Sequence, residues 1–345
     1  MLSVAPQASL EEFGEATMKP NEQYRTESAP AVACRGELSV IVPLRHGGIG
    51  GGKLAYELLG RPGAPVLIVA GGISAGRHVL ASYDFAEPGW WQSQSGTLDP
   101  SRFQILAIDW FGSNGSITRP IDPADQVEAL RQLLDHLGIA KAAAFIGASY
   151  GAMVGMHFAA LLPDRQGALL AISASDRPHP FASACRALQR GVITLGERHG
   201  DIASGVALAR AMAMLTYRTP DEFADRFGEA PIIRNTVVRV ASEDYLAAQG
   251  ERHCERMNGF AYRRLSESID LHRIEAETIK VPLTLVAVDS DALVPADDIE
   301  RMAGRLPGAT LHRISSRFGH DAFLKEEAQV GAIITSFLDT LELSR

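Results

Sequence analysis

The stretch that decides the fold is AFIGASYGAMVGMHFAALLPD, residues 144–164. Its first five residues are apolar or small, as in a buried strand, and the segment from Tyr150 onward has the length and apolar content of a buried helix. Between the two, Ser149 is the central residue of GASYG, a Gly-x-Ser-x-Gly pattern. A serine on a sharp strand-to-helix turn, flanked by glycines that permit close packing, is typical of a catalytic nucleophile. The alternative is an ordinary turn serine.

A second copy of the same pattern, GISAG at residues 72–76, means that the pattern alone does not choose the nucleophile. Its serine, Ser74, also follows an apolar strand-like run, but the next segment, RHVLASYDFAEPGWW, is a poor helix. A loop after an early strand suits another task, which is to donate backbone N–H groups to an oxyanion. We therefore predict Ser149 as the nucleophile, with the backbone N–H groups of Gly72 and Tyr150 as the oxyanion hole.

Strand-like and helix-like segments alternate on both sides of the opening stretch. Apolar runs such as APVLIVAGG, FQILAIDWFG and ALLAISAS read as buried parallel strands, and ADQVEALRQLLDHLGI has apolar residues at helical spacing. This pattern predicts an α/β fold with a mostly parallel central sheet covered on both faces. We expect the core at 36–175 and 281–345, a helical lid inserted at 176–280, and a polar, flexible N-terminal extension at 1–35.

A glycine-rich run, GGIGGGK at residues 47–53, matches the beginning of a phosphate-binding loop. The next residue is Leu54 where the magnesium-binding Ser or Thr of such a loop should stand. A strand-like segment follows where a helix should offer its N-terminus to phosphate. We interpret the run as a hairpin turn between two strands.

The composition is that of a globular protein with 345 residues, 46% of them hydrophobic, and a net charge of −8. The acidic balance argues against a general nucleic-acid binder. The three cysteines, Cys34, Cys185 and Cys254, are far apart and predict neither a disulfide framework nor a zinc site, which fits a reducing cytoplasm. The N-terminus lacks the apolar core of a secretory signal, and glycines and polar residues interrupt the uncharged stretch at 142–163, so we expect no membrane span.

A serine nucleophile needs a histidine base and a carboxylate that orients the histidine. The segment VAVDSDALVP places Asp289 and Asp291 at the end of a predicted strand, and SRFGHDAFL places His320 in a loop after another. The order serine, acid, histidine is the one that this elbow pattern predicts, and all three positions follow strands at one sheet edge. Asp291 lies further beyond its strand, so we expect it to orient His320, with Asp289 as the alternative.

These residues resemble the MetX-type homoserine O-acyltransferases of the α/β-hydrolase superfamily. The motifs that carry the resemblance are GASYGA, DSDALVP and GHDAFL, supported by PGWW, GVALARAMAMLTYRT and LSESIDLHR. The resemblance runs from about Gly36 to the C-terminus. It implies an α/β-hydrolase fold, a homodimer, and transfer of an acyl group from acyl-CoA to the hydroxyl of L-homoserine in methionine biosynthesis. It also implies a catalytic triad of Ser149, Asp291 and His320.

Further roles follow from the resemblance, position by position. It implies that Arg210 and Asp321 bind the amino-acid substrate and that Leu293 stands at a position tied to acyl-group choice. Arg190 matches a family arginine of less defined role. A succinyl carboxylate would require an arginine or backbone donors, for which Arg77 and Arg186 are candidates.

The chain departs from the common acetyltransferase pattern, with GASYGA for GGSMGG and AGGIS for HALTG. These departures resemble a divergent branch that uses succinyl-CoA, so we expect a homoserine O-succinyltransferase. Homoserine O-acetyltransferase and serine O-acyltransferase are alternatives, and so is an esterase or thioesterase with the same triad. The non-enzymatic alternative is a binding protein that has the hydrolase fold but no catalytic activity.

Acyl-CoA is a substrate in this reaction, so we expect no cofactor and no metal. The expected partners are the small-molecule substrates, with neither nucleic acid nor membrane, and the expected location is the cytoplasm. We expect Trp90 and Trp91 to pack under a loop rather than to line the cleft.

Overall fold

The structure, a computed structural model, describes residues 32–341. The extension expected at 1–35 lies outside the described residues except for its last four positions, of which Ala33 already begins the first strand. The strands are β1 (Ala33–Pro43), β2 (Ile49–Gly60), β3 (Val66–Ala70), β4 (Gln104–Ile108), β5 (Ala144–Ala148), β6 (Leu169–Ile172), β7 (Ile232–Arg234), β8 (Val237–Arg239), β9 (Leu283–Val288) and β10 (Thr310–Ile314). The helices are α1 (Pro123–His136), α2 (Tyr150–Leu161), α3 (Pro180–Arg198), α4 (Ile202–Tyr217), α5 (Pro220–Phe227), α6 (Ser242–Cys254), α7 (Gly259–Leu271), α8 (Ala296–Ala303), α9 (Ala322–Lys325) and α10 (Glu327–Asp339).

Within the described residues, eight strands form one sheet in the order β1-β2-β4-β3-β5-β6-β9-β10. From β4 to β10 the neighbouring strands are parallel, whereas β1 and β2 form an antiparallel hairpin at one end. The glycine-rich run lies in this hairpin, where β1 pairs with β2 as far as Pro43 and Ile49, so its interpretation as a turn is confirmed. The parallel strands bring the loops at their carboxyl ends to one edge of the sheet.

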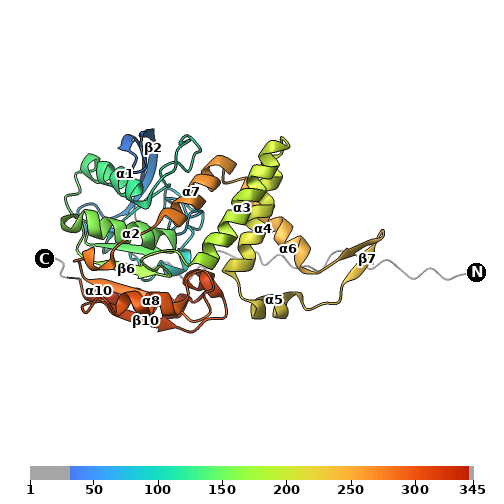
Figure 1. The fold of residues 1–345 in the computed structure, drawn as a ribbon. Coiled ribbons are helices and arrows are strands. Elements are labelled where there is room, and N and C mark those ends of the chain that lie inside the picture. The colour runs from blue at the N-terminus through green and yellow to red at the C-terminus, as the bar shows by residue number, and fades with distance from the viewer. Residues whose placement is uncertain (1–31, 342–345) are drawn as a thin grey trace, which may run out of the picture. The chain divides into compact units, whose positions relative to one another are not determined.

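Both faces of the sheet are covered, as expected for parallel strands (Figure 1). In β3, Val66 and Ile68 pack into the apolar core on one face, which also contains buried residues of α1, α2 and α8. The alternate residues Leu67 and Val69 pack into a second core against α10. Successive side chains of a strand point to opposite faces, so this five-residue strand is apolar throughout.

Helices α3 to α7 lie between β6 and β9, the place where the sequence predicts a helical insertion. Figure 1 shows α3 and α4 side by side, next to the sheet, with the β7–β8 hairpin beyond α5 and α6. No sequence pattern predicted this hairpin, whose strands have only three residues each. No helix within residues 32–341 has the length and apolarity that crossing a bilayer requires.

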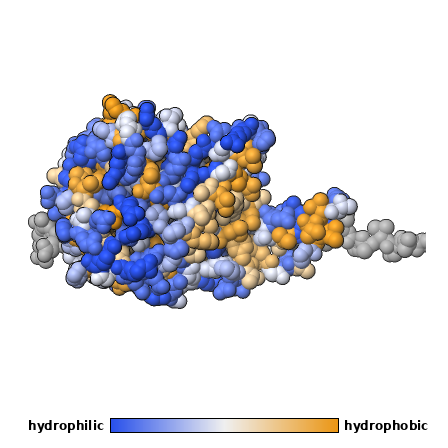
Figure 2. Space-filling view, in the orientation of Figure 1, coloured by the Kyte–Doolittle hydropathy of each residue, from blue (hydrophilic) through white to orange (hydrophobic). Residues whose placement is uncertain are grey.

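The outer faces of α3 and α4 carry large apolar side chains. Figure 2 shows them as an apolar strip over the lid helices, with further apolar surface at the hairpin. The side chains on α3 and α4 that are more than half exposed are Phe181, Leu188, Leu195, Leu208 and Leu215. Contiguous apolar surface of this kind is typical of a protein interface.

Candidate active site

Ser149 occupies a strained turn between β5 and α2. Its φ of 55° lies in the left-handed region, which residues other than glycine rarely adopt. The flanking glycines are required by close contacts, because a Cβ on Gly147 would lie 2.5 Å from the carbonyl oxygen of Gly151. A Cβ on Gly151 would lie 2.2 Å from the carbonyl oxygen of Ala70. The turn holds the Ser149 hydroxyl at the sheet edge, in the geometry that the Gly-x-Ser-x-Gly pattern predicts.

The three residues predicted as a triad are joined by hydrogen bonds. Nε2 of His320 lies 2.8 Å from Oγ of Ser149, and its Nδ1 lies 2.7 Å from Oδ2 of Asp291. The other oxygen of Asp291 accepts from the backbone N–H groups of Leu293 and Val294, each at 2.9 Å. These two bonds fix the carboxylate, so Nδ1–H of His320 donates to Asp291 and Nε2 accepts from the serine hydroxyl.

The choice between the two aspartates is decided by where they point. Asp289 forms an ion pair with Arg313 at the surface, and its side chain is 38% exposed. Asp291 is buried beside His320. The structure therefore brings Asp291, and not Asp289, to the histidine.

The electrostatics of the triad favour a basic histidine. Burial alone would lower the pKa of His320, but the charge and hydrogen bond of Asp291, with the charge of Asp321, outweigh it and raise the pKa above its ordinary value. A raised pKa strengthens the imidazole as an acceptor of the serine proton. The arrangement is therefore suited to activation of the Ser149 hydroxyl.

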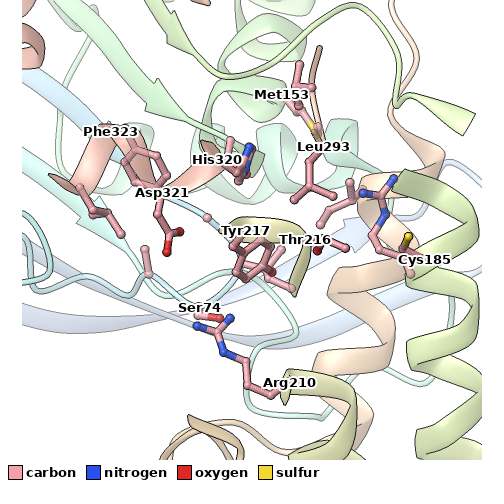
Figure 3. A pocket seen from close by; sticks show the side chains of 18 of the residues that line it. Ser74, Met153, Cys185, Arg210, Thr216, Tyr217, Leu293, His320, Asp321 and Phe323 are labelled. Carbon is pink, nitrogen blue, oxygen red and sulfur yellow. The ribbon is translucent and has the colours of Figure 1, made fainter. Parts of the chain in front are cut away.

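A cavity of about 200 Å³ opens at Ser149 and His320, between the core and the lid (Figure 3). Apolar side chains form much of its wall, and Leu293 is one of them. Trp90 also lines the cavity, contrary to the expectation that it only packs under a loop. Trp91 is fully buried with its indole N–H donating to the carbonyl oxygen of Phe323, so the packing prediction is confirmed for Trp91 alone.

The predicted oxyanion hole lies at the same end of the cavity. The N–H of Gly151 donates to the carbonyl oxygen of Gly71 at 2.8 Å, which ties the start of α2 to the loop after β3. Gly72 lines the cavity, and Tyr150 is the first residue of α2. Among the described residues, neither the N–H of Gly72 nor that of Tyr150 donates to a backbone carbonyl. Both groups are therefore available to a developing negative charge.

The predicted substrate-binding pair, Arg210 and Asp321, lies in the cavity. Figure 3 shows the guanidinium of Arg210 and the carboxylate of Asp321 both reaching into it, with Tyr217 between Arg210 and His320. The guanidinium of Arg210 lies 5.1 Å from the centre of the Tyr217 ring, which stacks on His320. Asp321 is the residue before α9 but makes no side-chain cap bond, so a capping role does not explain it.

Asp321 has a partner that sequence reasoning missed. Nε of Arg218 lies 2.9 Å from its Oδ2, and a terminal nitrogen of Arg218 pairs with Glu222 at 2.7 Å. Burial raises the pKa of Asp321, although the positive charges of Arg218, His320 and Arg210 oppose the shift. Arg218 directly follows α4, and no local pattern marks it, because its partner is more than 100 residues away.

The three arginines considered for a further carboxylate are in different places. Arg186 lines the cavity, whereas Arg190 and Arg77 do not. Arg190 lies behind Arg186 on α3 and contacts the same carboxylate, Asp270. Arg77 is held by Asp109, through its backbone N–H at 2.8 Å and its side chain at 3.6 Å.

Other lining residues had no signal in the sequence. Cys185 and Gln189 on α3, Thr216 and Tyr217 on α4, and Met153 on α2 all line the cavity. Their periodicity is that of ordinary packed helices, so only the placement of the lid on the core reveals them.

Comparisons with known proteins agree with this geometry. A family profile described as alpha/beta hydrolase fold matches residues 64–327. The chain is 49% identical to a homoserine O-succinyltransferase of Xanthomonas campestris pv. campestris, over 91% of this chain and 86% of the relative. It is 32% identical to a homoserine O-acetyltransferase of Thermus thermophilus, over 82% of this chain and 84% of the relative.

Solved structures agree on the fold. The homoserine O-acetyltransferase from Bacillus anthracis superposes with a TM-score of 0.81 at 16% identity, covering 91% of this chain and all of that one. Esterase E22 superposes with a TM-score of 0.78, also at 16% identity, covering 89% of this chain and all of that one. At such identity the likeness concerns the fold alone. The sequence matches decide the family: this chain belongs to the alpha/beta hydrolase fold family and, within it, to the homoserine O-acyltransferases.

Proposed function

We propose that this protein transfers a succinyl group from succinyl-CoA to the hydroxyl of L-homoserine, through an acyl-serine intermediate, in methionine biosynthesis. The observation that carries the proposal is the hydrogen-bonded series Ser149–His320–Asp291, which opens into a cavity containing Arg210 and Asp321. The 49% identity to a homoserine O-succinyltransferase supports succinyl-CoA as donor and homoserine as acceptor.

In the first half of the reaction, Ser149 attacks the thioester carbonyl while Nε2 of His320 accepts the hydroxyl proton. The bond between Oγ and the acyl carbon forms, and the carbon–sulfur bond then breaks. The backbone N–H groups of Gly72 and Tyr150 stabilise the oxyanion, and loss of one such donor typically costs about 3 kcal/mol. His320 returns the proton to the leaving thiolate, so free CoA departs and an acyl-serine remains.

In the second half, the amino acid occupies the cavity. The guanidinium of Arg210 binds its carboxylate, and the carboxylate of Asp321 binds its ammonium group. His320 accepts the proton of the acceptor hydroxyl, whose oxygen attacks the acyl carbon. The bond to Ser149 breaks, and His320 gives the proton back to the serine. The reaction consumes no cofactor, because the acyl-CoA is itself a substrate.

The alternatives differ in the substrate and not in the triad. Homoserine O-acetyltransferase and serine O-acyltransferase are the alternatives among transferases, and the 32% identical Thermus thermophilus acetyltransferase is the observation that supports acetyl transfer. An esterase or thioesterase would use the same three residues with water as acceptor. The opposite charges of Arg210 and Asp321 favour an amino acid over water, because both charges of a zwitterion then find partners.

Thiol release, followed with a thiol-reactive dye, tests these assignments. Succinyl-CoA and acetyl-CoA are each assayed with L-homoserine, with L-serine and without an amino acid. We expect sustained release from succinyl-CoA, beyond one equivalent per enzyme, only when L-homoserine is present. Equal release without an amino acid would indicate a hydrolase, and faster release from acetyl-CoA would indicate an acetyltransferase. An absence of release from both donors would indicate a binding protein.

We also propose that the protein acts as a homodimer in the cytoplasm. The exposed apolar strip over α3 and α4 supports the dimer, because it gives a second copy an apolar surface to cover. Light scattering after size-exclusion chromatography tests this, with Leu188→Glu and Leu195→Glu as variants expected to shift the protein toward the monomer mass.

A further inference from the structure

The inner face of α3 carries a polar group that the steps above leave unused. Arg186 and Gln189 both line the cavity, three residues apart on one helix face. Arg190, one residue further, lies behind them and does not reach the cavity. The active-site cavity therefore contains a second guanidinium, besides that of Arg210.

Arg186 and Arg190 share a single carboxylate. A terminal nitrogen of Arg186 lies 2.6 Å from Oδ1 of Asp270, and one of Arg190 lies 2.7 Å from Oδ2. The side chains are 12% and 19% exposed, so water screens them little. Two positive charges and one negative charge leave one positive charge in excess at this wall. Within residues 32–341, no other acidic side chain pairs with either arginine.

Arg186 and Gln189, which both line the cavity, have donors that remain available. Arg186 donates from Nε to Asp270 at 2.8 Å and from one terminal nitrogen to the hydroxyl of Ser183 at 3.1 Å. Its other terminal nitrogen has no acceptor among the described residues. The side-chain oxygen of Gln189 accepts from Tyr262 at 3.4 Å, and its amide nitrogen likewise has no described acceptor. A guanidinium and an amide that face one cavity can bind the two oxygens of a carboxylate.

The rest of the wall suits a short hydrocarbon chain. Met153, Ile269, Leu293 and Val294 line the same cavity as Ser149 and Arg186. Apolar contacts of this kind stabilise methylene groups, whereas a buried free carboxylate would be costly without a paired charge. The cavity therefore combines a nucleophile, an apolar wall and a partly unsatisfied cation.

We propose that Arg186, assisted by Gln189, binds the free carboxylate of a dicarboxylic acyl group while its thioester carbon lies at Ser149. The donor specificity of this enzyme then depends on α3 of the lid, and Arg210 remains for the amino acid. The inference rests on the proposed function in that it assumes an acyl-CoA donor and an acyl-serine.

The test compares two donors that differ in the charge at the end of the acyl chain. Succinyl-CoA and butyryl-CoA have acyl chains of the same length, with a carboxylate or a methyl group at the end. The readout is the ratio of their kcat/KM values for CoA release with L-homoserine. We expect Arg186→Met to lower the succinyl-to-butyryl ratio by about 30-fold, the loss of a hydrogen bond to a charged group. Arg186→Lys should restore part of the ratio.

Arg190→Met is the matched control, because it removes the other guanidinium from the same carboxylate. We expect it to lower the donor ratio by less than Arg186→Met does, because it removes the excess positive charge but leaves the hydrogen-bond donors of Arg186 at the cavity. Equal losses for both donors in Arg186→Met, with an unchanged ratio, would mean a purely structural role and would overturn the inference. Equal changes of the ratio in the Arg186→Met and Arg190→Met variants would overturn it as well.

Assays of the wild-type enzyme distinguish an error in the Arg186 assignment from an error in the proposed function. If wild-type protein releases no CoA from succinyl-CoA with any amino acid, succinyl transfer itself is wrong, and the Arg186 assignment falls with it. If wild-type protein prefers succinyl-CoA and the Arg186→Met variant keeps that preference, only the Arg186 assignment is wrong.

Discussion

Oγ of Ser149 lies 2.8 Å from Nε2 of His320, although 171 residues separate the two in the chain. The contact forms because both residues follow strands of one parallel sheet, β5 and β10, whose carboxyl ends meet at the same edge. Asp291 follows β9, which lies next to β10 in the sheet, and it completes the hydrogen-bonded series. The hydrogen bond pairs the nucleophile with its base.

Replacing the nucleophile should abolish turnover without unfolding the protein. Ser149→Ala removes the attacking oxygen, and we expect kcat to fall by at least about 10⁴-fold. The melting temperature should change little, because alanine has nearly the same volume. Ser74→Ala, in the other Gly-x-Ser-x-Gly pattern, is the control and should retain most activity. Full activity in Ser149→Ala would show that the nucleophile is a different residue.

Substitutions of the two aspartates that follow β9 should have very different effects on kcat. Asp291→Asn leaves the shape intact but removes the charge that orients and stabilises His320, so kcat should fall by about 10⁴-fold. Asp289→Asn removes only a surface pair with Arg313, and its effect on kcat should be less than about twofold. Steady-state rates at pH 7.5 measure both. The reverse order of effects would contradict the assignment.

The rate of enzyme acylation should fall at acid pH. His320 must be neutral to accept the serine proton, and its pKa is raised above the ordinary value, so kcat/KM should decline as the pH drops through a value above 6.5. The Asp321 carboxylate contributes to this raised pKa. Asp321→Asn should therefore move the acid limb to lower pH. The burst of CoA release without amino acid measures this limb separately from homoserine binding, and an unmoved limb would argue against the coupling.

The buried pair His157 and His272 should make the fold sensitive to acid. Nε2 of His157 lies 3.1 Å from Nδ1 of His272, whose Nε2–H donates to the carbonyl oxygen of Ser175 at 2.8 Å. Burial lowers the pKa of His157 to about 3 and that of His272 to about 4. Both side chains are thus neutral in the folded protein at pH 5, whereas in the unfolded chain they are mostly protonated.

These lowered pKa values determine the direction in which the stability of the fold changes with pH. The unfolded state binds more protons below about pH 6.5, so the free energy of unfolding should decrease by up to about 1.4 kcal/mol per histidine and pH unit between pH 6.5 and 4. Denaturant unfolding at several pH values measures this slope. His157→Phe should make it shallower. An unchanged slope in that variant would mean that other groups cause the acid sensitivity.

Adding one methyl group at the turn after Ser149 should be costly. In Gly151→Ala the new Cβ would lie 2.2 Å from the carbonyl oxygen of Ala70, so backbone must move and we expect about 2–3 kcal/mol of destabilisation. Gly96→Ala is the matched control. Its Cβ would meet nothing within 4 Å, and the stability should change by less than about 1 kcal/mol. Equal midpoints of denaturant unfolding for the two variants would contradict this account of the turn.

Much of the fold could be predicted because its determinants are local. The apolar runs at β3, β5 and β6 and the glycines around Ser149 each act on the backbone within a few residues. The order of serine, acid and histidine along the chain then restricted the partners of Ser149 to a few residues near the ends of late strands. Small elements escaped prediction, as the three-residue strands β7 and β8 show, because so short a segment carries no period.

The sequence by itself determined the strand–turn–helix at Ser149 and the alternating core, since side-chain volume and backbone preference act between near neighbours in the chain. The sequence favoured Asp291 over Asp289, and the structure places Asp291 at His320. Only the tertiary structure decided that Arg218 pairs with Asp321 and that Arg186 rather than Arg190 lines the cavity. These contacts depend on how each helix or loop orients its side chains when the lid packs on the core. This orientation is determined by contacts between residues that are distant in the chain, and a local sequence pattern does not predict such contacts.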